Sequence, residues 1–310
     1  MSTFLHHIYL SVPPFVLVAV GYALIQWGRW PRDISEALTR FVFTIALPAM
    51  MFRMMSDFSR LPAVDARLLI AFFGSCLVVF VVGRFVGWRL FRLDGVGQSV
   101  FALGGVFSNT VLLGIPLTKA TLGDAALPSV ALVLVFNALT LWTLVTISVE
   151  WARHGSFTAA GFAKMTVKVA TNPVIAAIVL GTLLGLTGIK IPELIDAPLA
   201  MVAQAAAPMS LIALGAGLAE YGVRNGWRLS VAICVLKILV QPLVVWWMAH
   251  VLGLPHLETQ VVVLLASLPV GVNVYLMSRQ FKTLEGPVAS SMVISTALSA
   301  LTTPLILTLI

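Results

Sequence analysis

Charged residues are scarce in this chain. They make up 10% of its 310 residues, whereas a soluble domain has about a quarter. Hydrophobic residues make up 60%, and the mean hydropathy is +1.03. So much apolar surface cannot be hidden in one aqueous core, which excludes a soluble globular domain. The composition predicts a protein that crosses a lipid bilayer many times. Its net charge of +7 lies in short loops and does not indicate a nucleic-acid partner.

The chain also has few of the residues that redox or metal chemistry needs. Its two cysteines, Cys76 and Cys234, fall inside apolar runs and are expected to be packing residues rather than a disulfide or metal pair. The five histidines lie at helix ends or in loops, without metal-ligand spacing. We therefore expect no catalytic residues, no metal and no cofactor. An intramembrane enzyme is disfavoured because it would need a nucleophile–base or metal pair at membrane depth.

Acidic residues are missing from the predicted membrane centre. All 12 carboxylates fall in loops or near helix ends. A sodium–proton antiporter holds its cation or proton with acids at membrane depth. The distribution of carboxylates therefore argues against that function.

Ten apolar runs are long enough to be membrane-spanning helices, each of which needs about 20 residues. The longest polar connector, 151–165, separates a first five-helix unit at 1–150 from a second at 166–310, and it is too short for a domain of its own. The fold class predicted is an all-α membrane protein. The spans cover about 8–28, 34–55, 66–91, 96–119, 127–150, 166–187, 194–220, 227–252, 258–280 and 286–309.

The distribution of lysine and arginine over the loops predicts the orientation. With the N-terminus outside, the inner loops hold Arg29, Arg32, Arg89, Arg92, Arg153, Lys164, Lys168, Arg224, Arg228, Arg279 and Lys282. The outer loops hold only Arg60, Arg67, Lys119 and Lys190, with Arg53 nearby. We expect a multi-pass protein of the cell (inner) membrane with both termini on the outer, periplasmic side. Each unit has an odd number of spans, so the second runs upside down relative to the first.

The two units repeat one pattern at a shift of about 160 residues. Pro13 corresponds to Pro173, and Pro48 in FTIALPAMM corresponds to Pro208 in QAAAPMSLI. At the same shift, residues 100–117 lie over residues 260–277. A broken helix in a bilayer leaves backbone groups unpaired unless they line a polar cavity, so paired breaks indicate a transport site in an inverted repeat.

The fourth and ninth spans carry the strongest break signals. The fourth has Asn109 and Thr110 in mid-helix, followed by the helix-weakening Gly114 and by Pro116, which cannot donate a hydrogen bond. The ninth has Pro269, Gly271 and Asn273 in the equivalent places. Two interrupted helices that cross would aim free amide groups and helix N-termini at one spot, which suits an anion.

These motifs closely resemble the auxin efflux carrier family. Plant members have an N-T-x-x-x-G-I-P-L crossover followed by K-A-x-x-G-D, and residues 109–124 match that pattern. Further resemblance lies in FVFTIALPAMMF (41–52), LKILVQPL (236–243) and SLPVG (267–271), so it covers the whole chain. The bacterial branch is associated with malonate and other carboxylates, and the plant branch with indole-3-acetate. This chain looks like a bacterial member, without the long central hydrophilic loop of many plant proteins.

The resemblance implies an elevator-type carrier related in fold to bile acid transporters and sodium–proton antiporters. Segments 1, 2, 6 and 7 would form a scaffold, often dimeric, and segments 3–5 and 8–10 a mobile transport unit. Asn109 would be the substrate-binding asparagine. Plant carriers also have an aspartate–lysine pair four residues apart at the start of segment three. Here Asp65 is followed at that distance by Leu69, so that site is not transferred.

Each polar candidate has a structural alternative. Asn109 and Thr110 are both predicted to bind substrate. For Asn109, the alternative is a hydrogen bond that packs one helix against another. Asn273 could contact substrate or cap a half-helix. Asn137, in the fifth span, could face either the cavity or a neighbouring helix. Lys237 looks deeply intramembrane. Its charge could replace a coupling cation, draw in an anionic substrate, or cap half-helix carbonyls, unless it snorkels to the interface.

The function predicted is secondary transport of a small organic anion, such as a carboxylate or an indole-3-acetate-like acid, by alternating access. The alternative is a sodium- or proton-coupled organic anion symporter of the bile-acid type, which would need clustered acid and amide oxygens around both breaks. A non-transporting sensor would usually carry a soluble output domain. We expect a lipid bilayer, a small anionic substrate and a second copy bound through the scaffold helices as partners.

Overall fold

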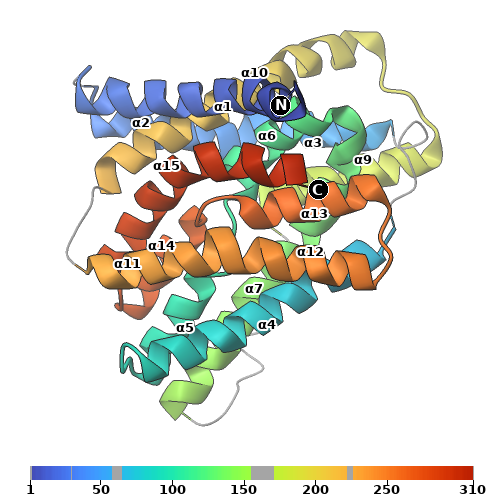
Figure 1. Cartoon of the computed structure of the whole chain (residues 1–310). Coiled ribbons are helices and arrows are strands. Elements are labelled where there is room, and N and C mark those ends of the chain that lie inside the picture. Colours follow the sequence, from blue (N-terminus) through green and yellow to red (C-terminus); the bar gives the residue numbers. More distant parts are fainter. Residues whose placement is uncertain (1, 29, 58–64, 155–170, 222–225, 310) are drawn as a thin grey trace.

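The computed structural model shows an all-α protein (Figure 1). It describes residues 2–28, 30–57, 65–154, 171–221 and 226–309. Within these ranges every regular element is helical, and the one β-type pairing is an isolated antiparallel bridge between Ser108 and Val270.

In the first half, α1 spans Ser2–Gln26, and α2 (Arg32–Phe41) continues through the π-helical turn η1 (Val42–Ala46) into α3 (Leu47–Ser56). Helix α4 spans Arg67–Arg89 and α5 spans Gly95–Gly104. A second π-helical turn, η3 (Thr110–Gly114), leads into α6 (Ile115–Leu122). The short helix η4 (Asp124–Ala126) precedes α7 (Leu127–His154).

In the second half, α9 spans Pro173–Thr187 and α10 spans Glu193–Tyr221. Helix α11 (Trp227–Val235) continues through the π-helical turn η5 (Leu236–Val240) into α12 (Gln241–Val251). Helices α13 (His256–Ser267), α14 (Val272–Phe281) and α15 (Glu285–Leu309) complete the chain. The predicted connector overlaps α7 up to residue 154, and the rest of it, with the start of the sixth span, lies outside the described residues.

Five described helical segments are long and apolar enough to cross a membrane: Asp33–Ser56, Arg67–Arg89, Glu193–Ala219, Trp227–Val251 and Glu285–Leu309. Four shorter apolar helices accompany them: Val12–Gln26, Thr110–Leu122, Asp124–Asn137 and Pro173–Thr187. An integral membrane protein follows from these segments. The number of spans stays a prediction.

Each π-helical turn ends two residues before a proline: Pro48, Pro116 or Pro242. A proline lacks the amide proton and its ring clashes with the carbonyl four residues earlier, so a widened turn lets the helix continue. By contrast, Pro13 and Pro208 lie inside the helices α1 and α10, and Pro173 begins α9. The corresponding prolines of the two halves therefore do not cause matching interruptions.

The helices form two packing groups. Helices α1, α2–α3, α9 and α10 pack mainly on one another, and α4, α5, α6, α7 and α11–α15 form the second group. In Figure 1, α1, α2 and α10 lie along the top and α4, α5 and α7 along the bottom. Glycines allow close approach in the first group: a Cβ atom at Gly215 would lie 1.9 Å from Val18 O, and one at Gly181 would lie 2.5 Å from Phe52 O. The groups meet where α1 and α10 contact α6 and α15 and where α10 contacts η3.

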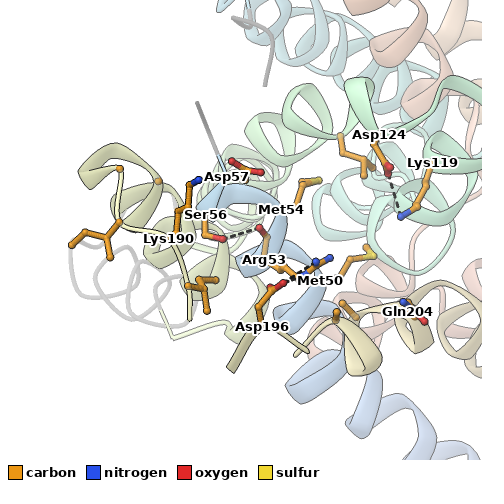
Figure 2. Close-up of a pocket in the computed structure, with 17 residues that line it drawn as sticks. Met50, Arg53, Met54, Ser56, Asp57, Lys119, Asp124, Lys190, Asp196 and Gln204 are labelled. Atoms are coloured by element: carbon orange, nitrogen blue, oxygen red, sulfur yellow. Dashed lines mark hydrogen bonds and ion pairs between the residues drawn. The ribbon is translucent and has the colours of Figure 1, made fainter. Parts of the chain in front are cut away.

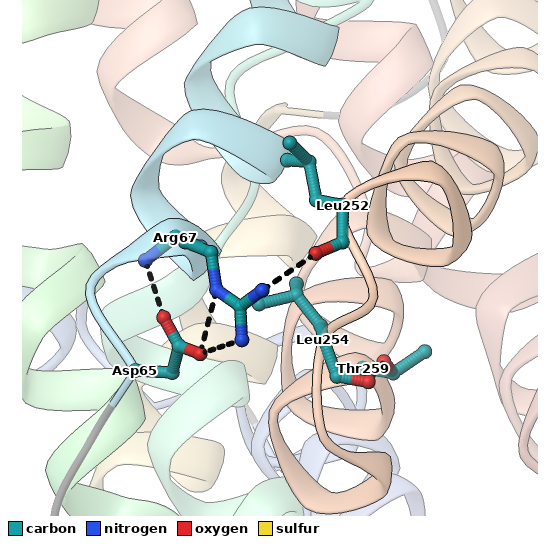
Figure 3. Close-up of polar contacts among 5 residues, drawn as sticks. All are labelled: Asp65, Arg67, Leu252, Leu254 and Thr259. Atoms are coloured by element: carbon teal, nitrogen blue, oxygen red, sulfur yellow. Dashed lines mark hydrogen bonds and ion pairs between the residues drawn. The ribbon is translucent and has the colours of Figure 1, made fainter.

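An ion pair fixes the start of α4 (Figure 3). The Arg67 guanidinium donates from Nε to Asp65 Oδ2 at 2.8 Å and from Nη1 to Leu252 O at 2.9 Å. Its hydrogen bonds hold the pKa of the Asp65 carboxyl below its ordinary range. Asp65 therefore pairs with Arg67 and not with a residue four positions later, and Arg67 also ties α4 to the end of α12.

Candidate functional site

The two broken helices meet at the isolated bridge. Helix α5 ends at Gly104 and α13 ends at Ser267, and residues 105–109 and 268–271 are not helical. The backbone N–H of Asn109 donates to Pro269 O at 2.9 Å, and the backbone N–H of Gly271 donates to Phe107 O at 2.8 Å. These reciprocal hydrogen bonds join segments that are about 160 residues apart in the sequence and pair backbone groups that the breaks leave free.

Gly271 allows the two segments to come this close. A Cβ atom there would lie 2.7 Å from Ser108 O and 3.0 Å from the Ser108 carbonyl carbon. On the other side, the Val270 amide donates to Ser295 Oγ of α15 at 3.0 Å. The second break is therefore held between the first break and α15.

Two helix N-termini begin directly after the bridge. The π-helical turn η3 starts at Thr110 and α14 starts at Val272. The first amides of a helix have no acceptor within the helix, and the helix dipole makes this end positive. The opposite ends, at the last turns of α5 and α13, carry the negative partial charge of the helix dipole. The crossover thus has two ends of each sign.

Asn109 lies at the centre of this arrangement. Its side chain is 5% exposed, and its Nδ2 atom has no hydrogen-bond partner within the described part of the chain. The neighbouring Thr110 is also buried, and its hydroxyl donates to Ser108 O at 3.5 Å. A buried amide without an acceptor is costly, by about 1–3 kcal/mol, so this donor marks a place where an acceptor from a ligand would be stabilising.

The two other predicted asparagines lie in different surroundings. Asn273 is half-buried in the first turn of α14, two residues after Gly271. Asn137 is buried on α7, a helix that packs against α6 and α13, and its Oδ1 lacks a partner among the described residues. The structure therefore places Asn109, Thr110 and Asn273 beside the bridge and Asn137 on a neighbouring helix.

The first break begins earlier than the sequence predicts. Gly114 is the last residue of η3, and Pro116 is the second residue of α6, so both are helical. The π-helical turn accommodates Pro116, while the chain leaves the helix at Gly105. Gly114 instead provides close packing, since a Cβ atom there would lie 2.8 Å from Leu268 Cδ1. Pro269 and Gly271 both lie within the second break.

Lys237 is fully buried in the π-helical turn η5. Its ammonium group donates to Ala266 O, in the last turn of α13, at 2.5 Å. The positive charge therefore lies at the negative end of a half-helix, which is one of the arrangements expected from the sequence.

Gln241 is a residue that the sequence analysis did not select. It begins α12, is fully buried, and donates from Nε2 to Val106 O in the first break at 3.0 Å. A signal was available in LKILVQPL, because an amide four residues after a buried lysine lies about one helical turn away.

A cavity of about 680 Å³ lies between the two packing groups, at their predicted outer ends (Figure 2). Helices α3 and α10 contribute the bidentate pair of Arg53 and Asp196, with Nε–Oδ1 at 2.7 Å and Nη2–Oδ2 at 3.0 Å. Across the cavity, Lys119 of α6 pairs with Asp124 at 3.2 Å. Lys190 also lines the cavity. Charged side chains from both groups thus face one water-accessible space.

The part of the chain that the structure describes contains no group of three or more His, Cys, Asp or Glu side chains that could hold a metal ion. Cys76 and Cys234 are both buried and free.

Comparisons with known proteins identify relatives along the whole chain. A family model described as membrane transport protein matches residues 7–156 and 156–307. A putative malonate transporter of Rhizobium meliloti (strain 1021) is 26% identical over 299 residues, covering 94% of this chain and 92% of the relative. Uncharacterized transporters of Methanocaldococcus jannaschii and Escherichia coli (strain K12) are each 24% identical, covering 92% and 95% of this chain and 93% and 94% of the relatives.

Proposed function

Because this chain belongs to the membrane transport protein family, the family of the auxin efflux carriers, we propose that it moves a small organic anion across the cell membrane. The observation that carries this proposal is the bridge between the two broken helices, because two helix N-termini begin beside it. A secondary transporter needs a polar site within the membrane, and interrupted helices supply one.

The site offers donors that suit a carboxylate. The first amides of η3 and α14 are neutral donors, and so is the Nδ2 atom of Asn109, which has no partner among the described residues. They attract an anion without a buried charge of their own. Thr110 is the first residue of η3 and Asn273 is the second residue of α14. Both side chains would orient the ligand. Asn137 would contribute from α7.

Lys237 supports movement without a coupling ion. Its ammonium occupies the negative end of α13, where a cation would otherwise be stabilised. A monoanion leaves a negative-inside cell downhill by about 2.3 kcal/mol per 100 mV, so efflux needs no further driving force.

The two packing groups suggest an elevator-type movement. In this proposal α1, α2–α3, α9 and α10 form the scaffold and a homodimer contact, and the remaining helices carry the crossover as a unit. The interface between the groups includes the outer cavity, which would admit substrate from the periplasmic side. Two inverted five-helix repeats of an inner-membrane protein, with both termini outside, fit this arrangement.

A thermal-shift screen tests the function directly. One relative is named a malonate transporter, so malonate and other small mono- and dicarboxylates are the first probes and indole acids the second. A ligand at a hundred times its Kd stabilises the folded protein by about 2.7 kcal/mol. We expect the shift to disappear in Asn109→Ala.

Asn172→Ala is the matched control for that screen. Asn172 caps the start of α9 by accepting from the Val174 amide at 2.9 Å. Its loss costs about 1 kcal/mol, so this variant should melt earlier and still show the full ligand shift. If no carboxylate or indole acid shifts the wild-type protein, the proposed substrate class is wrong.

Charge reversal at Lys190 tests the route through the outer cavity. Lys190→Glu is expected to lower the uptake kcat/KM for malonate about threefold at low salt, with little change at about 0.5 M salt, because long-range attraction is screened. Lys282→Glu, at the end of α14 on the predicted inner side, should leave uptake from outside unchanged. A salt-independent effect of Lys190→Glu would exclude electrostatic steering.

A further inference from the structure

One helix provides a donor to each of the broken helices. The element α11–η5–α12 packs through α11 against α5 and through η5 and α12 against α13. Lys237 and Gln241, both fully buried in this element, are four positions apart. The side chains donate to Ala266 O at the end of α13 and to Val106 O just after α5.

Both acceptors belong to the negative ends of the half-helices. Ala266 lies in the last turn of α13, and Val106 lies two residues after the end of α5. Carbonyl groups at these positions lack partners within the helix and carry the negative end of its dipole. Left unpaired beside the crossover, they would repel the anion that the N-termini attract.

The orientation of the Gln241 amide is determined by its surroundings. Nε2 lies 3.0 Å from Val106 O and 3.4 Å from Cys76 Sγ on α4. A flipped amide would put two acceptors against each other. The titratable groups that the structure places beside this amide are Lys237 and the Cys76 thiol. A carboxylate at position 241 would remove the donor and would also neutralise Lys237.

We propose that Gln241 is a positioning residue for anion selectivity. Together with Lys237, it pairs carbonyl groups at the negative ends of both half-helices, so that they do not repel an anion held by the N-terminal amides and the Asn109 donor. This inference rests on the proposed function, and it assigns to a neutral residue a role in the choice of substrate charge.

Gln241→Met tests the inference because it removes the donor to Val106 O and adds no charge beside Lys237. We expect the KM for malonate in proteoliposomes to rise about tenfold or more, with the maximal rate per folded molecule little changed.

Gln280→Met replaces an exposed glutamine at the end of α14; it is the matched control and should keep the wild-type KM. A merely structural role for Gln241 predicts fewer folded molecules, hence a lower maximal rate with unchanged KM. That outcome, with active wild-type protein, overturns the inference alone. If wild-type protein transports and binds no carboxylate, the proposed function fails and the inference fails with it.

Discussion

Lys237→Met is expected to abolish transport while the protein stays folded. Methionine fills a similar volume, so the packing around η5 changes little. The substitution leaves Ala266 O without its donor, at about 1–3 kcal/mol, but it also removes a buried charge whose desolvation is itself unfavourable. Stability should therefore change modestly. Transport should fall about a hundredfold, the loss that follows removal of one preorganised electrostatic partner.

The measurement is anion flux in proteoliposomes with a membrane potential, together with size-exclusion chromatography of the purified variant. Lys282→Met, which removes a lysine at the C-terminal end of α14, is the control and should transport normally. Replacing sodium with choline should leave wild-type flux unchanged if the Lys237 charge takes the place of a coupling cation. Normal uptake by Lys237→Met would refute this role.

The sequence predicted the second break better than the first. Pro269 and Gly271 both lie in non-helical residues, as expected of a proline and a glycine that interrupt a helix. In the first span, the sequence predicted a break at Pro116, but a π-helical turn accommodates this proline, and the chain leaves the helix at Gly105. A single sequence does not show which of two adjustments a proline will induce.

Tertiary partners were the part of the site that sequence could not supply. The depth of Lys237 was predictable from its apolar surroundings, whereas its acceptor, Ala266 O, depends on how α13 packs against η5. Likewise Arg53 and Asp196 are 143 residues apart in the sequence and meet only because α3 packs on α10. The chemical character of each residue could be predicted from the neighbouring sequence. The partner of each residue could not, because it depends on how distant helices pack.

Gly271→Ala is expected to separate the two broken helices. The glycine has φ −75° and ψ 149°, which any residue can adopt, so backbone strain does not enter. The added methyl group would instead lie 2.7 Å from Ser108 O, and backbone atoms cannot turn away as a side chain can. We expect a loss of stability of about 1–3 kcal/mol and a larger loss of transport, because the helix N-termini on both sides of the bridge would shift.

Gly87→Ala distinguishes this effect from the general consequences of replacing a glycine. Gly87 lies in α4, where a Cβ atom would meet its nearest neighbours at 3.4–3.5 Å, an ordinary contact. Alanine within a helix is more stable than glycine by about 1 kcal/mol, so this variant should melt slightly later and keep full flux. Scanning fluorimetry and proteoliposome flux on the two variants give the comparison. If Gly271→Ala keeps both the melting temperature and the flux, close contact at the bridge is not what holds the anion site together.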